Sequence, residues 1–252
     1  SEEFYIKKNM LISEMQRESL FNRQKFYFNI IKFFKKNNLN EIANKMDPNK
    51  GKGLIFIVGM PRSGTTLTES ILSTANDITA GGEKNFFPVQ LNETISNLNS
   101  ETILSEKFFI ELGDRYLHFV KSHRKNKTNF IDKLPENFLY YKFIKLALPK
   151  AKFVHCVRDI WDTSTSLFKQ NYSVNVFFAS SFFGIATEFA NYLYLIDFWK
   201  KLDGENCFYE IKYEEMTSDP HKIVNGLWSF LELSGEYDEK KRQSHFGRTT
   251  SM

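Results

Sequence analysis

A loop able to hold an anion follows the first strongly apolar run of this sequence. The residues Gly59-Met60-Pro61-Arg62-Ser63-Gly64-Thr65-Thr66 come directly after the apolar stretch 54–58. Small residues let backbone N–H groups approach a phosphate, and a helix that begins near Thr65 turns its positive end toward the same place. Arg62 is the cation of the loop. The pattern predicts a cradle for a diphosphate-like anion.

The loop has the glycine spacing of the phosphate loop G-x-x-x-x-G-K-[ST] but lacks its lysine. Thr65 stands at the position of that lysine, which in nucleoside triphosphatases contacts the terminal phosphates beside Mg²⁺. Its loss argues against phosphoryl transfer from ATP. We therefore predict that Arg62 binds the end of the anion without a metal.

A second anion site is predicted after the apolar run that ends at Val157. The segment Phe153-Val154-His155-Cys156-Val157-Arg158-Asp159 brings Arg158 to the end of a strand, and Ser166 follows eight positions later in a helix. A guanidinium fork with a hydroxyl suits a dianionic phosphate on a ribose. His155 lies within the predicted strand, and we interpret it as structural.

These residues lie on an alternating pattern of strands and helices. Strands are predicted at 54–58, 129–132, 152–157 and 207–213. Helices are predicted at 10–36 (one or two helices), 65–73, 85–96, 105–122, 137–148, 162–170, 177–201 and 220–231. Strands separated by helices imply right-handed crossovers and a mainly parallel sheet, in which ligands bind beyond the carboxyl ends of the strands. The candidate residues follow those ends.

Taken together, the motifs resemble the sulfotransferases that use 3′-phosphoadenosine 5′-phosphosulfate (PAPS), and within them the branch of the tyrosylprotein sulfotransferases and bacterial relatives linked to tetratricopeptide repeats. Pro61-Arg62-Ser63-Gly64-Thr65-Thr66-Leu67 is similar to the family's loop for the 5′-phosphosulfate, and Arg158 with Ser166 is similar to its 3′-phosphate site. The resemblance covers most of residues 54–231. It implies a P-loop-like (nucleotide-kinase-like) α/β fold of three layers, with a mainly parallel sheet flanked by helices.

The resemblance also implies catalytic roles. Glu83, 21 positions after Arg62, stands where relatives with a carboxylate base carry a glutamate, and an alcohol or phenol needs a positioned base to become a nucleophile. Lys133 resembles the lysine that stabilises charge on the transferring group. Tyr213, in Lys212-Tyr213-Glu214-Glu215, resembles a signature that ends a strand near the nucleotide. The implied binding residues are Arg62, Ser63, Gly64, Thr65, Thr66, Leu67, Arg158, Ser166 and Tyr213.

The implied reaction is an in-line displacement at sulfur that moves the sulfuryl group from PAPS to a hydroxyl and leaves adenosine 3′,5′-bisphosphate (PAP), without a metal. Peptide tyrosine, carbohydrate and small alcohols remain open as acceptors, whose pocket is expected from residues 85–105 and 177–189. Two other classes remain open: a nucleotide or small-molecule kinase of related fold, and a non-catalytic PAPS- or PAP-binding module.

The sequence departs from the family's pattern at two places. Gln170 stands where the animal enzymes carry a further arginine toward the cofactor. Gly247-Arg248-Thr249-Thr250-Ser251 resembles the beginning of a C-terminal segment that in relatives continues over the cofactor. The sequence also lacks an initiator methionine and stops abruptly at Met252, so we expect it to be an excised part of a longer protein, in which helical repeats are compatible with the resemblance.

Composition sets the remaining expectations. The chain has 252 residues, enough for one sizeable α/β domain, and the turn-rich stretch near Gly51 divides an N-terminal helical segment, 1–50, from a sulfotransferase domain, 51–252. A net charge of +4 falls short of a nucleic-acid-binding surface. No apolar run is long enough to span a membrane and no signal peptide opens the chain. With only two cysteines, Cys156 and Cys207, we expect reduced thiols and a cytoplasmic protein.

Overall fold

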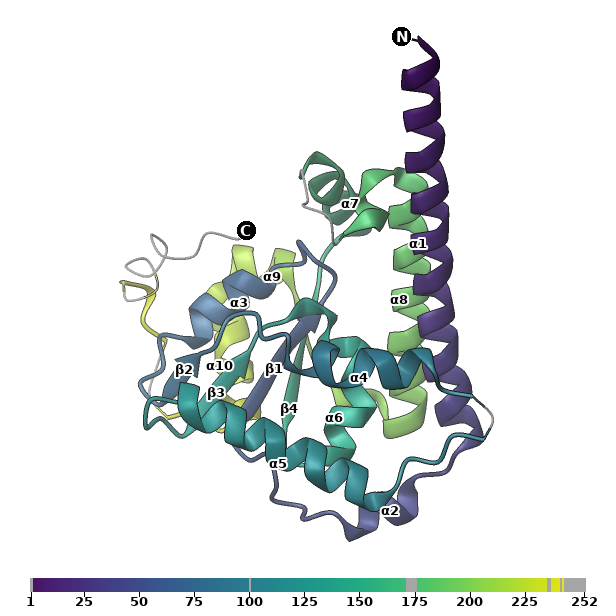
Figure 1. Cartoon of the computed structure of the whole chain (residues 1–252). Coiled ribbons are helices and arrows are strands. Elements are labelled where there is room, and N and C mark those ends of the chain that lie inside the picture. Colours follow the sequence, from purple (N-terminus) through teal and green to yellow (C-terminus); the bar gives the residue numbers. More distant parts are fainter. Residues whose placement is uncertain (1, 100, 171–175, 235–236, 241, 243–252) are drawn as a thin grey trace.

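A parallel sheet forms the centre of the molecule. The computed structural model describes residues 2–99, 101–170, 176–234, 237–240 and 242. Within these residues, five strands pair in the order β2-β3-β1-β4-β5, and every pair is parallel (Figure 1). The strands are β1 (Leu54–Gly59), β2 (Ile78–Ala80), β3 (Asn129–Asp132), β4 (Lys152–Val157) and β5 (Tyr209–Lys212). All carboxyl ends therefore meet at one edge of the sheet.

Helices cover both faces of the sheet (Figure 1). The α-helices are α1 (Glu2–Lys36), α2 (Asn40–Lys45), α3 (Thr65–Leu72), α4 (Phe86–Ser96), α5 (Glu106–His123), α6 (Tyr141–Ala147), α7 (Ile160–Lys169), α8 (Phe182–Asp203), α9 (Tyr213–Ser218) and α10 (Pro220–Leu231). The 3₁₀-helices are η1 (Pro135–Tyr140), η2 (Phe177–Ser180) and η3 (Glu205–Cys207).

Alternation along the buried strand β1 separates two apolar cores. Leu54, Phe56 and Val58 join the larger core, with α1, α4, α5, α6 and α8, whereas Ile55 and Ile57 join the smaller one, with α3 and α10. Because successive side chains of a strand point to opposite faces, a strand covered on both sides must be apolar throughout. The predicted α/β fold of three layers with a mainly parallel sheet is confirmed.

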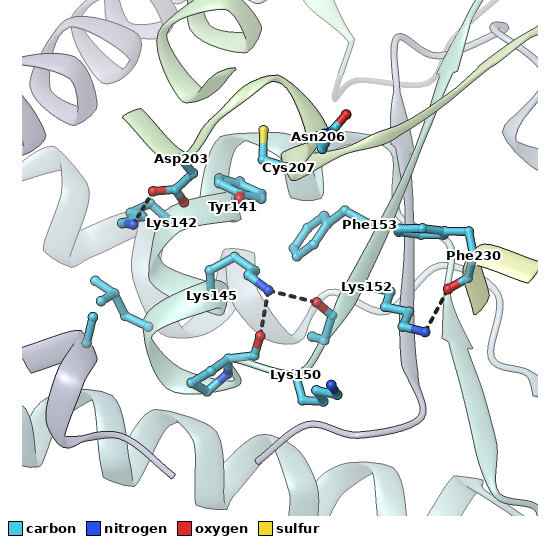
Figure 2. Close-up of a pocket in the computed structure, with 14 residues that line it drawn as sticks. Tyr141, Lys142, Lys145, Lys150, Lys152, Phe153, Asp203, Asn206, Cys207 and Phe230 are labelled. Carbon is cyan, nitrogen blue, oxygen red and sulfur yellow. Dashed lines mark hydrogen bonds and ion pairs between the residues drawn. The ribbon is translucent and has the colours of Figure 1, made fainter. Parts of the chain in front are cut away.

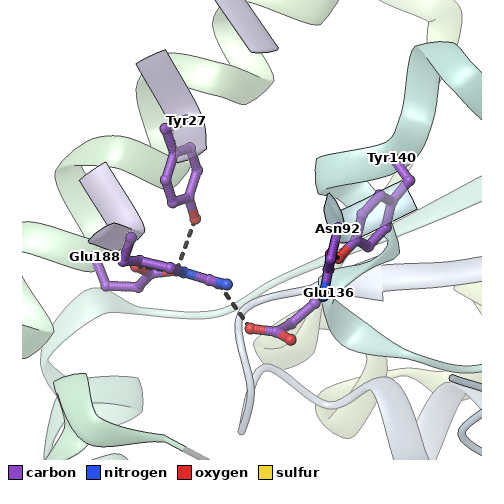
Figure 3. Close-up of polar contacts among 6 residues, drawn as sticks. Tyr27, Asn92, Glu136, Tyr140 and Glu188 are labelled. Carbon is purple, nitrogen blue, oxygen red and sulfur yellow. Dashed lines mark hydrogen bonds and ion pairs between the residues drawn. The ribbon is translucent and has the colours of Figure 1, made fainter. Parts of the chain in front are cut away.

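The long helix α1 packs along α8 and contributes to the larger core. Tyr27, Ile30, Phe33 and Phe34 are buried there, and polar contacts reinforce the packing. Arg23 of α1 lies against two carboxylates, Glu188 of α8 and Glu136 of η1 (Figure 3). The predicted division of the chain at residue 50 stays a prediction.

Three short elements and one predicted strand differ from the sequence-based expectation. The strand β2 and the helices α2 and α9 were not predicted, because three residues or six carry too little periodicity to be recognised. The strand predicted at 207–213 extends only over β5, since Cys207 ends η3. Tyr213 was predicted to end a strand, and this is wrong: Tyr213 is the first residue of α9, directly after β5.

Candidate active site

Candidate residues from four loops lie at the carboxyl edge of the sheet. The loop with Arg62 follows β1, Glu83 follows β2 by three residues, and Lys133 and Arg158 follow β3 and β4 directly. Parallel pairing places these strand ends side by side, as in the register Ala80 to Ile131. Residues far apart in the sequence therefore come from adjacent loops, as predicted for a site in an open parallel sheet.

The loop after β1 is held by two glycines that tolerate no side chain. A Cβ on Gly59 would lie 2.4 Å from the carbonyl oxygen of Cys156, and a Cβ on Gly64 would lie 2.6 Å from Cδ2 of Tyr213. Gly64 also has a φ of 96° and precedes the first turn of α3. Arg62 has a φ of 71°, in the left-handed region that non-glycine residues seldom occupy. The loop therefore follows a tight path that turns its backbone into the start of a helix.

The two predicted anion sites are adjacent, and their side chains contact each other. Nε of Arg62 donates a hydrogen bond of 3.0 Å to Oγ of Ser166 on α7. One terminal nitrogen of Arg158 donates to the carbonyl oxygen of Arg62 at 3.2 Å. The guanidinium carbon of Arg158 lies 4.4 Å from the centre of the Tyr213 ring, a cation–π distance. The structure thus brings Arg62, Arg158, Ser166 and Tyr213 together.

Two buried donors in this cluster have no hydrogen-bond partner within the described residues, namely Oγ of Ser63 and Nε of Arg158. Buried polar groups are nearly always paired in proteins, so unpaired donors at a strained loop fit an anionic ligand. Thr65 and Thr66 form the first turn of α3, where free N–H groups favour an anion. Leu67 packs against the smaller core, which leaves its backbone as the group that can face a ligand.

Glu83 and Lys133 form a close ion pair. Nζ of Lys133 lies 2.7 Å from Oε1 of Glu83, and the lysine side chain is 9% exposed against 57% for the glutamate. The backbone N–H of Lys133 also donates to the carbonyl oxygen of Gly82, at 3.0 Å. An accessible carboxylate thus stands beside a largely buried cation, the combination that proton removal from a hydroxyl next to a developing negative charge requires.

Two buried acids beside this pair were not found by sequence reasoning. Glu69 of α3 accepts a hydrogen bond of 2.9 Å from the N–H of Gly82, and burial raises its pKa, against the opposing effect of Lys133. Asp132 accepts hydrogen bonds from Tyr116 and Asn137, and burial raises its pKa to about 7. The available signal was position: Glu69 lies one helical turn after Thr65, and Asp132 directly precedes Lys133.

Other candidates lie outside the site. His155 is buried within the sheet, where its ring nitrogens meet Glu210 and the Tyr192 hydroxyl, and burial lowers its pKa. Its interpretation as structural agrees with this position. Gln170 ends α7 as its C-terminal capping residue. The segment 247–251 lies outside the described residues.

A basic pocket of about 580 Å³ lies at the opposite edge of the sheet, beside the first residues of β4 (Figure 2). Lys142, Lys145, Lys150 and Lys152 line it, and three of these cations already bind the protein itself. Their acceptors are the carboxylates of Asp203 and Glu232 and the carbonyl oxygens of Pro149, Ala151 and Phe230. These three lysines thus form hydrogen bonds and ion pairs within the protein, and the pocket shares no residue with the candidate active site.

The chain belongs to the sulfotransferase family, whose sequence profile it matches over residues 55–239. It is 31% identical over 197 residues to an uncharacterized protein of Aquifex aeolicus, a match that covers 72% of this chain and 26% of that protein. It is 24% identical over 196 residues to a putative protein-tyrosine sulfotransferase of Caenorhabditis briggsae, over 76% of this chain and 69% of the relative. The resemblance found in the motifs is therefore confirmed at the level of the family.

Solved structures support the same fold. The sulfotransferase domain of the Synechococcus olefin synthase superposes with a TM-score of 0.55 at 17% identity, over 78% of both chains.

The chain spans about a quarter of the Aquifex protein and 69% of the Caenorhabditis relative. None of the helices in the described ranges is long and apolar enough to cross a membrane.

Proposed function

We propose that the chain transfers the sulfuryl group from PAPS to a hydroxyl acceptor. One observation carries the proposal: Arg62 and Arg158, which follow different strands, contact each other through the backbone carbonyl of Arg62, and the side chain of Arg62 also donates to Ser166. Two guanidinium groups and a hydroxyl at one sheet edge suit a nucleotide with phosphate on both sides of its ribose. Membership of the sulfotransferase family supports this choice of donor over ATP.

The residues of the loop would hold the 5′ end of the donor. The available groups are the backbone N–H groups of Gly64, Thr65 and Thr66, the hydroxyl of Ser63 and the guanidinium of Arg62. Of the two unpaired donors, the Ser63 hydroxyl lies in this loop and Nε of Arg158 lies beside it. Arg158 with Ser166 would hold the 3′-phosphate. Tyr213, stacked with Arg158, keeps this guanidinium oriented toward the loop.

Glu83 and Lys133 would act on the reacting groups. PAPS supplies an activated sulfuryl group, bonded to a phosphate oxygen that leaves. The Glu83 carboxylate removes the proton of the acceptor hydroxyl as its oxygen bonds to sulfur. Lys133 and Arg62 stabilise the negative charge that grows on the departing phosphate oxygen and on the sulfonate. The products are the sulfated acceptor and PAP, and the carboxyl group of Glu83 then releases its proton to water.

The binding step is tested by calorimetric titration of the chain with PAP and, separately, with ATP and Mg²⁺. We expect saturable binding of PAP and no comparable binding of ATP. Preference for ATP with Mg²⁺ would overturn the proposal in favour of a kinase of related fold.

The chemical step is tested with labelled PAPS and three acceptors, a tyrosine peptide, an oligosaccharide and a small alcohol. The variant Glu83→Gln is expected to lower the rate of transfer by about 10²- to 10⁴-fold while PAP binding is retained. The exposed glutamate of α2, replaced in Glu41→Ala, is the control. PAP binding without transfer to any acceptor would instead identify a non-catalytic binding module.

A further inference from the structure

The loop between β2 and α4, which carries Glu83, is fixed by three hydrogen bonds. The N–H of Gly81 donates to the carbonyl of Ile131 at 2.8 Å, and the carbonyl of Gly82 accepts from the N–H of Lys133 at 3.0 Å. These bonds join the loop to β3 and to the residue that directly follows it. A Cβ on Gly81 would lie 2.4 Å from the carbonyl oxygen of Ile131, so the loop runs as close to β3 as a backbone can.

The third bond comes from a side chain of another element. The N–H of Gly82 donates at 2.9 Å to Oε1 of Glu69, which belongs to α3. Among the described residues, this N–H has no other acceptor. An unpaired backbone donor in a partly buried loop is costly, so the carboxylate of Glu69 determines how the loop can lie.

Glu69 also connects the two halves of the candidate active site. It lies four positions after Thr65, which places both side chains on the same side of α3 and next to the loop that follows β1. Glu69 is only 6% exposed, so its side chain is too buried to contact the hydroxyl-bearing substrate directly. Its charge interacts with both members of the ion pair, Lys133 and Glu83.

We propose that Glu69 is a positioning residue, which fixes the Glu83–Lys133 pair relative to the donor loop through the N–H of Gly82. The inference rests on the proposed function, because it assigns Glu69 a role in transfer from PAPS. Glu69 touches neither donor nor acceptor in this role. Its contribution is to hold the glutamate base at a constant distance from the sulfuryl group, since a displacement of about 1 Å at such a base can cost about 100-fold in rate.

Two substitutions separate positioning from folding. Glu69→Ala removes the acceptor of the Gly82 N–H, whereas Glu69→Gln keeps an oxygen at that place and replaces the other carboxylate oxygen by an uncharged NH2 group. We expect Glu69→Ala to lower kcat by about 10- to 100-fold with little change in the KM for PAPS or in PAP binding. Glu69→Gln should recover most of the lost kcat, because the amide oxygen still accepts the hydrogen bond.

A second measurement does not depend on activity. Hydrogen–deuterium exchange of the segment 81–84 reports the Gly82 bond directly, and Glu41→Ala is the matched control at an exposed glutamate of α2. We expect faster exchange of this segment in Glu69→Ala, and exchange close to that of the wild-type chain in Glu69→Gln and Glu41→Ala.

If segment 81–84 exchanges in Glu69→Ala at the wild-type rate, the positioning role is overturned, whatever the activity of the chain. The role is also overturned if Glu69→Ala has the wild-type kcat, or if it loses kcat and PAP binding in equal proportion. Failure of the unchanged chain to transfer sulfuryl would instead count against the proposed function, and the exchange result would still decide whether Glu69 holds the loop.

Discussion

A terminal nitrogen of Arg158 donates a hydrogen bond to the backbone carbonyl of Arg62, at 3.2 Å. This bond ties the residue that follows β4 to the strained turn that follows β1. It leaves Nε of Arg158 buried and without a partner among the described residues. The same guanidinium can therefore hold the loop and still donate toward a ligand, which a lysine with a single terminal group cannot do in the same geometry.

Replacing Arg158 should weaken the binding of PAP strongly. A charged hydrogen bond to a phosphate contributes about 1.5–3 kcal/mol, so Arg158→Ala is expected to raise the Kd for PAP by about 10- to 100-fold. Arg158→Lys should recover only part of this loss, because the planar fork is missing. Titration calorimetry measures both. Arg115→Ala, at an exposed arginine of α5, is the control, and a Kd for Arg158→Ala equal to that of this control would show that Arg158 does not bind the nucleotide.

Gly64 should be irreplaceable because of its neighbour Tyr213 as well as its own backbone. An alanine there would adopt a φ of 96° and place its Cβ 2.6 Å from the tyrosine ring. The left-handed backbone alone costs about 1–3 kcal/mol of unfolding free energy. We expect Gly64→Ala to destabilise the chain by more than this amount, and by less in a Tyr213→Ala background, where only the backbone term remains.

Chemical denaturation is carried out on the wild-type chain, Gly64→Ala, Tyr213→Ala and the double variant. It gives the loss of unfolding free energy caused by Gly64→Ala with the Tyr213 ring present and with the ring removed. The difference between the two costs isolates the contact with the ring. An equal cost of Gly64→Ala in both backgrounds would mean that the ring moves aside freely and that Tyr213 is not held in place by its neighbours.

The residues that follow strands could be predicted from the sequence, but their partners could not. Arg62 and Arg158 stand next to apolar runs, and the rule that ligands bind at the carboxyl edge of a parallel sheet identifies them. Glu69 and Asp132 gain their importance from burial against distant elements, such as Gly82 across 13 positions and Tyr116 across 16 positions. A single sequence carries no periodicity that reports such contacts.

The start of α9 at Tyr213 could not be read from the sequence for a related reason. The run that leads into Tyr213 has the composition of a strand, whereas its neighbours in space determine where pairing stops. Strand β5 pairs with β4 as far as Val157 opposite Lys212, the last residues of both strands. Because β4 ends at Val157, β5 has no partner residue for pairing beyond Lys212 among the described residues, and the chain turns into α9 there.

Asp132 should make the stability of the chain depend on pH near neutrality. Burial raises the pKa of Asp132 from its usual value to about 7, so between about pH 4 and pH 7 the folded chain binds a proton that the unfolded chain does not. The free energy of unfolding therefore falls as pH rises through this range, by about 1.4 kcal/mol per pH unit and roughly 2 kcal/mol between pH 5 and pH 7.

The variant Asp132→Asn tests this pH dependence. Its amide oxygen can accept from Asn137 and its amide nitrogen can donate to the Tyr116 hydroxyl, so the local packing is kept. Denaturant unfolding at several pH values should show a flatter profile for the variant than for the unchanged chain. Parallel profiles would mean that Asp132 titrates at an ordinary value and is not the source of the dependence.

The contact between Arg23 and Glu188 should determine how firmly α1 is attached. Glu188 is 2% exposed and accepts from both Arg23 and the hydroxyl of Tyr27 (Figure 3). In Glu188→Ala, Arg23 keeps its contact with Glu136, but the buried hydroxyl of Tyr27 loses its acceptor, so the variant is expected to cost about 1–3 kcal/mol of unfolding free energy.

The double variant Arg23→Met with Glu188→Leu should cost less than Glu188→Ala, because apolar side chains replace the pair and Glu136, whose side chain is 37% exposed, can be solvated by water. Thermal and denaturant unfolding measure each cost, with Lys201→Ala, at an exposed i,i+4 pair of α8 with Asp197, as the control. A double variant that costs as much as Glu188→Ala would show that Arg23 and Glu188 stabilise the chain independently of each other, and that their ion pair does not attach α1 to α8.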